Sequence, residues 1–178
     1  VSLQNTGNTV TDNTVNAAVE GVGLLQGANS FSGNAFTIAT DANALNFYGT
    51  ASATNLLSSD NTVSIDGGGL QGAVDLAGRQ GTVNMGARTY NETVTIRGGL
   101  TLSGSGMDST AITGGISLSN TAFSDLTLQD FTLSGNGGGN SLVRNGRVTN
   151  LTVDGVRFDG EGVAGRHGFA GGQFGGDI

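Results

Sequence analysis

The sequence predicts an all-β fold, a parallel β-solenoid of about seven coils, and three observations carry this prediction. Glycine, threonine, asparagine and serine make up nearly half of the 178 residues, as expected for short strands joined by many turns. Apolar and polar residues alternate along several segments, which is the period of a β-strand. Whole segments also recur at offsets of 21 to 32 residues, which is typical of stacked coils.

The first repeat lies near the beginning of the sequence. Residues 7–15 (GNTVTDNTV) recur as residues 28–36 (ANSFSGNAF) at a constant offset of 21. This offset superposes four pairs of like residues: Asn8 and Asn29, Val10 and Phe31, Asn13 and Asn34, Val15 and Phe36. We therefore expect residues 1–56 to be the end of a run of coils, with apolar side chains stacked inside and threonine or asparagine stacked outside.

Residues 57–81 are expected to connect this run to a second one. Within them Leu70, Ala73, Val74 and Ala77 lie at helical spacing, which predicts a short helix near residues 70–77. The alternative is an irregular stretch of one continuous solenoid.

The second run, residues 82–178, contains three similar segments. VTIRGGLTLSG at 94–104, LTLQDFTLSG at 126–135 and LTVDGVRFDG at 151–160 align with offsets of 32 and 25. The alignment defines four interior files and two outward ones. The first interior file is Val94, Leu126 and Leu151, and the first outward file is Thr95, Thr127 and Thr152. Each segment then contains two short strands with a bend between them and a closing glycine.

A third strand per coil is expected at residues 116–119, 141–143 and 167–170. Three strands per coil with variable loops favour a solenoid over hairpins, because hairpins join strands of similar length through turns of about two to five residues. The sequence stops at Ile178, where the next coil would begin. We therefore expect the run to be cut within a repeat and continued by the same chain or by further copies.

Residues 82–118 (TVNMGARTYNETVTIRGGLTLSGSGMDSTAITGGISL) resemble the opening coils of right-handed, single-stranded parallel β-helix proteins of the pectin-lyase-like superfamily. The segments at 8–15, 126–135 and 151–160 are similar to the β-helix repeats of large secreted bacterial surface proteins. The resemblance implies a right-handed solenoid, a capping role for the helix near 70–77 on the first coil of the second run, and an extracellular or cell-surface location. The match is specific for architecture and not for activity, because many unrelated functions share the scaffold. The catalytic glutamine and aspartate motifs of pectin methylesterases do not occur in the sequence, so the resemblance carries no catalytic residue onto this chain.

Composition and charge exclude several classes of function. All seven basic residues are arginine, and 14 acidic residues give a formal charge of -7, so the clustered positive charge that binds nucleic acid is missing. Apolar runs stay well below the roughly 18 residues that span a bilayer. Without cysteine, disulfides, thiolate metal sites and cysteine nucleophiles are impossible.

The densest set of ionisable residues is Asp154, Arg157, Asp159 and Glu161, with Asp125 and Asp130 one coil earlier. From this set we take Asp130, Asp154, Arg157 and Asp159 as the candidate cluster. Carboxylates around an arginine could bind a saccharide or serve a polysaccharide-degrading enzyme, whose chemistry needs a positioned base and charge neutralisation. The alignment stacks Asp154 near Gln129 and Arg97, Asp159 over Ser134 and Ser103, and Arg157 over Thr132. A solvated cluster of ion pairs on the surface is the simpler interpretation.

Two further candidates are weaker. Asp108, in GSGMDST at 104–110, resembles half of a calcium-binding nonapeptide, but such sites are built from stacked copies and this one occurs once. His167 lies in a glycine-rich segment without a placed acid partner, which is typical of a turn residue and not of a general base. We expect no cofactor, with calcium as the one alternative.

These inferences favour a structural or adhesive β-solenoid segment of an extracellular bacterial surface protein, such as a filament, stalk, sheath or adhesin. The alternative function is a module that binds or degrades polysaccharide, using the groove over Asp130, Asp154, Arg157 and Asp159. The expected partners are further coils at the open ends and, in the alternative, a polysaccharide.

Overall fold

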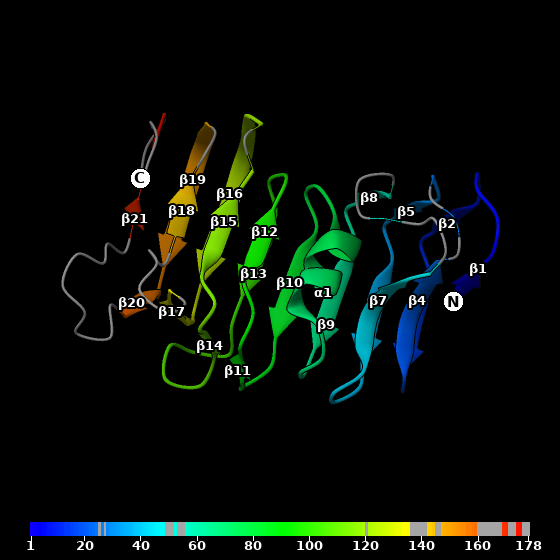
Figure 1. Cartoon of the computed structure of the whole chain (residues 1–178), viewed down its shortest axis with the longest axis horizontal. Helices are drawn as coiled ribbons and strands as arrows, with labels where there is room; N and C mark the ends of the chain where they lie inside the picture. Colours follow the sequence, from blue (N-terminus) through cyan, green and yellow to red (C-terminus); the bar gives the residue numbers. More distant parts are fainter. Residues whose placement is uncertain are drawn as a thin grey trace. The chain divides into compact units, whose positions relative to one another are not determined.

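The computed structural model describes residues 1–24, 26, 28–48, 52, 56–119, 121–135, 142–144, 147–159, 169–170 and 174–175. They form parallel strands stacked as a β-solenoid, together with one short helix (Figure 1). The chain divides into two compact units, Val1–Asn84 (unit 1) and Met85–Ile178 (unit 2). The predicted parallel β-solenoid is confirmed.

Unit 1 is built from three coils of three strands each among its described residues. One sheet consists of β1 (Ser2–Leu3), β4 (Glu20–Leu24) and β7 (Asn43–Phe47), and a second of β2 (Thr9–Thr11), β5 (Ser30–Ser32) and β8 (Leu57–Ser59). The third sheet contains β3 (Thr14–Ala17), β6 (Ala35–Ile38) and β9 (Thr62–Ile65), and β10 (Thr82–Met85) lies at the boundary of the units.

The register of unit 1 confirms the offset of 21 residues. Val10 pairs with Phe31 and Val15 with Phe36, all in parallel strands. Phe31 and Phe36 are buried, so the apolar files of the repeat form the core. Burial of side chains of this size stabilises the fold by about 1.5–3 kcal/mol each.

The predicted helix is α1 (Leu70–Ala77), and its position is confirmed. Within unit 1 it packs against β7, β8 and β9, the strands of the third coil (Figure 1). Gly72 allows this close approach, because a Cβ atom there would lie 3.1 Å from the carbonyl oxygen of Leu45. The helix therefore packs on the third coil of unit 1, and the capping role that the resemblance implies for it on the following run stays a prediction.

Unit 2 has four coils of three strands each among its described residues. Its sheets are β11 (Thr89–Tyr90), β14 (Ala111–Ile112), β17 (Thr132–Ser134) and β20 (Arg157–Asp159); β12 (Val94–Ile96), β15 (Ile116–Leu118), β18 (Leu142–Arg144) and β21 (Phe169–Ala170); and β13 (Thr101–Ser103), β16 (Phe123–Gln129), β19 (Val148–Asp154) and β22 (Phe174–Gly175). The middle sheet contains the expected third strands, since β15, β18 and β21 overlap the three predicted segments.

The interior file that begins with Val94 and the outward file that begins with Thr95 are each wrong at their first member. Leu126 pairs with Leu151 as expected, but Val94 pairs with Ile116 in a different sheet. The true neighbour of Thr127 in the preceding coil is Thr101, an offset of 26 and not 32. VTI at 94–96 and LTL at 100–102 have the same alternation, so the pattern alone fitted either strand.

Candidate functional site

Asp130 lies at the corner between β16 and β17. Asp154 lies on the neighbouring coil, at the end of β19. The backbone N–H of Asp130 donates to the carbonyl oxygen of Asp154 at 3.0 Å, and Gln129 pairs with Asp154 as predicted. In the preceding coil Gln129 pairs with Ser103, so Arg97 does not share this file as the alignment had it. Asp130 has a positive φ of 61° and both carboxylates are exposed.

Arg157 and Asp159 lie beyond the corner, on β20. They pair with Thr132 and Ser134, which confirms those two stackings, whereas Ser103 belongs to β13 in another sheet. Both residues are exposed. The four predicted residues therefore lie on two faces that meet at a corner, and a backbone hydrogen bond joins Asp130 to Asp154.

Arg157 is held by Asp108, the residue proposed as a calcium ligand. Its Nη2 lies 2.6 Å from Oδ1 of Asp108, across 49 residues of sequence. The Asp108 loop rests on β17, where the hydroxyl of Thr132 donates to the carbonyl oxygen of Met107 at 2.6 Å. The carboxylate and guanidinium side chains are 81% and 49% exposed, so this is a solvated ion pair.

The described residues contain no group of three or more histidine, cysteine, aspartate or glutamate side chains that could hold a metal ion. Calcium binding at Asp108 stays a prediction. His167, Glu161 and the glycine-rich segments around them lie outside the described residues.

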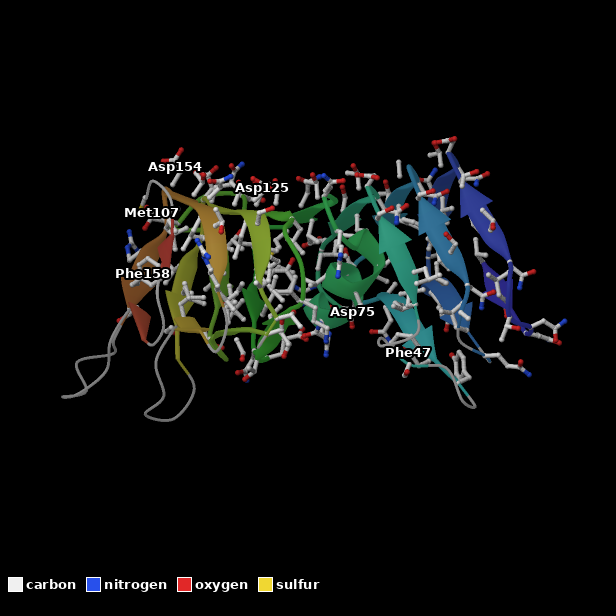
Figure 2. The ribbon with its side chains drawn as sticks, turned by 90° about the horizontal axis from the view of Figure 1, so that it is seen from above. Phe47, Asp75, Met107, Asp125, Asp154 and Phe158 are labelled. Atoms are coloured by element: carbon white, nitrogen blue, oxygen red, sulfur yellow. The ribbon has the colours of Figure 1, made fainter. Side chains whose placement is uncertain are left out.

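Asp125 belongs to a second corner of the same coil. Its carboxylate accepts hydrogen bonds from the hydroxyl of Ser124 at 2.6 Å and from Nδ2 of Asn150 at 3.0 Å. These bonds, that from Ser124 first, hold the pKa of Asp125 below its ordinary value. Figure 2 shows Asp125 and Asp154 directed outward along one edge of unit 2.

Asn13, Asn34 and Asn61 of unit 1 form a hydrogen-bonded ladder, which we call the asparagine ladder. Asparagine was predicted on the outer face, and for Asn34 and Asn61 this prediction is wrong. Asn34 and Asn61 are 1% and 0% exposed. Each follows a residue with positive φ, Gly33 at 66° and Asp60 at 54°, and this left-handed step turns the asparagine inward.

The ladder links three coils through paired hydrogen bonds. The backbone N–H and Nδ2 of Asn13 both donate to Oδ1 of Asn34, at 3.0 and 3.1 Å. The same two groups of Asn34 donate to Oδ1 of Asn61, at 2.8 and 2.9 Å. A buried amide is stabilising only when its hydrogen bonds are made, and here they are made from coil to coil.

The ladder ends on α1. Nδ2 of Asn61 donates to the carbonyl oxygen of Leu76 at 2.9 Å, and the hydroxyl of Ser58 donates to the same oxygen. Carbonyls in the last turn of a helix lack partners within the helix. Ser58 pairs with Phe31 in the preceding coil, so this interior file changes from an apolar to a polar side chain. The change supplies a hydrogen-bond donor to the carbonyl oxygen of Leu76 in the last turn of α1.

A second polar cluster, which we call the Glu20 cluster, was missed by the sequence analysis. Oε2 of Glu20 accepts hydrogen bonds of 2.7 Å from Nδ2 of Asn46 and from the hydroxyl of Tyr48. Gly23 lies beneath them: a Cβ atom there would collide with Oε1 of Glu20 and lie 3.3 Å from the Tyr48 ring. A glycine at this position is therefore required for the cluster.

Hydrogen bonding shifts the titration of both ionisable members. The bond from Tyr48, followed by that from Asn46, holds the pKa of Glu20 below its ordinary value. The bond to Glu20 raises the pKa of Tyr48. Glu20 is thus a carboxylate at neutral pH, and Tyr48 keeps its proton.

One sequence signal pointed to this cluster. Glu20 is the only charged residue in the described strands of unit 1 that precede α1. Its partners are 26 and 28 residues away, so the neighbourhood appears only when the register of β4 on β7 is known.

No protein-family model, no curated protein and no solved structure matches the chain. The pectin-lyase-like resemblance therefore stays a prediction, and the fold itself is what the structure establishes. Among the described residues no helix is long and apolar enough to cross a membrane.

Proposed function

We propose that the chain is a structural β-solenoid segment, serving as a rigid or adhesive element of an extracellular bacterial surface protein. The observation that carries the proposal is the asparagine ladder. Three of its amides, Asn13, Asn34 and Asn61, are bonded from one coil to the next, and the last is bonded to α1.

The ladder favours a structural role because of how the buried polar groups are used. Amides inside a wall could line a ligand cavity, but Asn34 and Asn61 make hydrogen bonds to backbone and to each other. Such bonds stiffen the stack of coils in unit 1. The candidate residues Asp130, Asp154, Arg157 and Asp159 are exposed.

Composition supports the proposed location. The chain lacks cysteine, has no lysine and carries a formal charge of -7, which suits a protein that must stay soluble without disulfides. The resemblance to repeats of secreted surface proteins points the same way.

Immunogold electron microscopy of the native source, with antibodies raised against the chain, tests this function. We expect label along elongated structures at the cell surface. Label confined to the cytoplasm, or to a dispersed secreted protein, would contradict the proposal.

The polysaccharide-degrading alternative makes an opposite prediction. It requires turnover of polygalacturonate or alginate by the native chain and loss of that turnover when Asp130, Asp154, Arg157 and Asp159 are replaced by alanine. The structural role predicts no turnover before any replacement.

A further inference from the structure

The Glu20 cluster has features that the structural role does not require. Its carboxylate is the single charged group on the described strands before α1, and it is fixed by two side chains of the neighbouring coil. Tyr48 remains 48% exposed although its hydroxyl is bonded. Figure 2 marks Phe47, the residue before it, at the end of β7.

We propose that Glu20, Asn46 and Tyr48 form a binding site for a pyranose ring of a neutral saccharide. The site goes beyond the structural role, and the two can fail independently, because the microscopy above does not depend on these three side chains.

The tyrosine supplies the apolar surface. An aromatic ring that is half exposed can stack on the C–H face of a sugar. The bond from its hydroxyl to Oε2 of Glu20 fixes the ring before any ligand arrives. Less conformational freedom is then lost on binding, which favours affinity.

The carboxylate and the amide supply acceptors for sugar hydroxyls. Both hydrogen bonds described for Glu20 use Oε2, and its Oε1 lies next to Gly23. An ionised carboxylate accepts several hydrogen bonds, and Asn46 keeps a side-chain carbonyl oxygen when its Nδ2 donates. Pairs of hydroxyl groups on one sugar ring match this arrangement of acceptors beside an aromatic face.

Charge selects neutral sugars over acidic ones. Residues 1–84 hold six acidic side chains against one arginine, Arg79, a side-chain charge of -5. A uronate would bring a further negative charge beside Glu20, where like charges repel. A cluster that only fastens β4 to β7 would not need an exposed aromatic ring.

The test titrates the full chain with cellopentaose, xylopentaose and mannopentaose, with trigalacturonate as the acidic comparison. Tyrosine fluorescence and calorimetry follow binding. The chain has two tyrosines and no tryptophan, and Tyr90 is 3% exposed, so Tyr48 is the tyrosine that a surface ligand can reach.

We expect at least one neutral oligosaccharide to bind at up to millimolar concentration and to change the Tyr48 signal. Tyr48→Ala and Glu20→Gln should each weaken binding about tenfold or more, and Tyr48→Phe should weaken it less because the ring remains. Asn16→Ala, an exposed asparagine of β3, is the matched control and should leave binding unchanged.

Three results would overturn the proposal. The first is a native chain whose Tyr48 signal responds to none of the neutral sugars, a result that needs no variant to fold. The second is equal binding by correctly folded Tyr48→Ala and Glu20→Gln variants, with folding checked by circular dichroism. The third is binding of trigalacturonate as tight as that of the best neutral sugar.

Discussion

At the scale of single residues, Asn34 shows how a polar side chain can stabilise a core. Its Oδ1 accepts two bonds from one neighbouring coil, and its Nδ2 donates to the amide of the other and to backbone carbonyls. Removal of such a residue leaves partners on both sides without hydrogen bonds inside the wall.

Replacing Asn34 with leucine should lower the free energy of unfolding by about 2–4 kcal/mol, because the buried amide of Asn61 loses a donor and the part-buried N–H groups of Asn13 lose their acceptor. Urea denaturation followed by circular dichroism measures the change. Asn16→Ala, on the exposed face of β3, should change the free energy by less than about 0.5 kcal/mol. Equal effects of the two substitutions would contradict the role given to the ladder.

Tyr48 should titrate above its ordinary pKa, since the hydrogen bond to Glu20 favours its protonated form. Spectrophotometric titration at the phenolate absorption band would show this shift. In the Glu20→Gln variant the exposed tyrosine should ionise at lower pH than in the native chain. An identical titration in both proteins would contradict the contact.

The sequence predicted which asparagines stack but not where they point. The offset of 21 aligned Asn13 with Asn34 correctly, and the pairing of the strands confirms it. The inward direction depends on the left-handed conformation of the preceding residue, such as Asp12 at φ 54°. Aspartate and asparagine tolerate positive φ, but they also occur often at ordinary φ, so their presence predicts a left-handed residue less strongly than glycine does.

At the scale of strands, the register of unit 2 shows why a repeat can be recognised and still be misaligned. The segments at 126 and 151 were aligned correctly because both the strand and the corner after it matched. The segment at 94 matched equally well in a different strand of its coil. Alternation fixes which residues are inward, and only the loop lengths decide which sheet a strand joins.

Engineered cysteines distinguish the two registers, because the native chain has none. Paired residues in neighbouring parallel strands lie about 4.8 Å apart, within the range that a disulfide spans. The double variant Thr101→Cys, Thr127→Cys should form a disulfide on oxidation, since these residues pair. The double variant Thr95→Cys, Thr127→Cys should not, and its efficient oxidation would show that the register is wrong.

The end of α1 depends on Gly78, which has φ of 69°. A Cβ atom there would collide with the carbonyl group of Ser58, so Gly78→Ala should lower the free energy of unfolding by about 2 kcal/mol or more. Thermal unfolding measures this loss. Gly69→Ala is the matched control: its Cβ would meet only Oδ1 of Asn43, at 3.8 Å, and should cost less than about 1 kcal/mol.

At the scale of the whole molecule, the fold class and the helix could be predicted because both depend on local periodicity. Alternation and whole-coil repeats indicated stacked strands, and the spacing of Leu70 to Ala77 indicated α1. Contacts such as Arg157 with Asp108, 49 residues apart, could not be predicted, because they depend on how loops cross neighbouring coils.

Stability of the whole chain should fall in acid. The folded-state pKa values of Glu20 and Asp125 lie below their ordinary values, so their contribution is present above the unfolded-state values. It is lost as the pH falls through the folded-state values. Melting temperatures measured between neutral pH and pH about 3 should decline, and the decline should be smaller in the double variant Glu20→Gln, Asp125→Asn. If the melting temperature fell equally in the native chain and in the double variant, groups other than Glu20 and Asp125 would be responsible for the acid sensitivity.

The direction of the asparagine bonds has a consequence for how this wall could be extended. Asn13 donates its backbone N–H and Nδ2 to Oδ1 of Asn34, and Asn34 donates the same two groups to Oδ1 of Asn61. The first pair of residues is 21 positions apart and the second 27. The junction is therefore indifferent to loop length. A whole coil could be inserted or deleted while the asparagine hydrogen bonds between the remaining coils form in the same way, so the number of coils can vary.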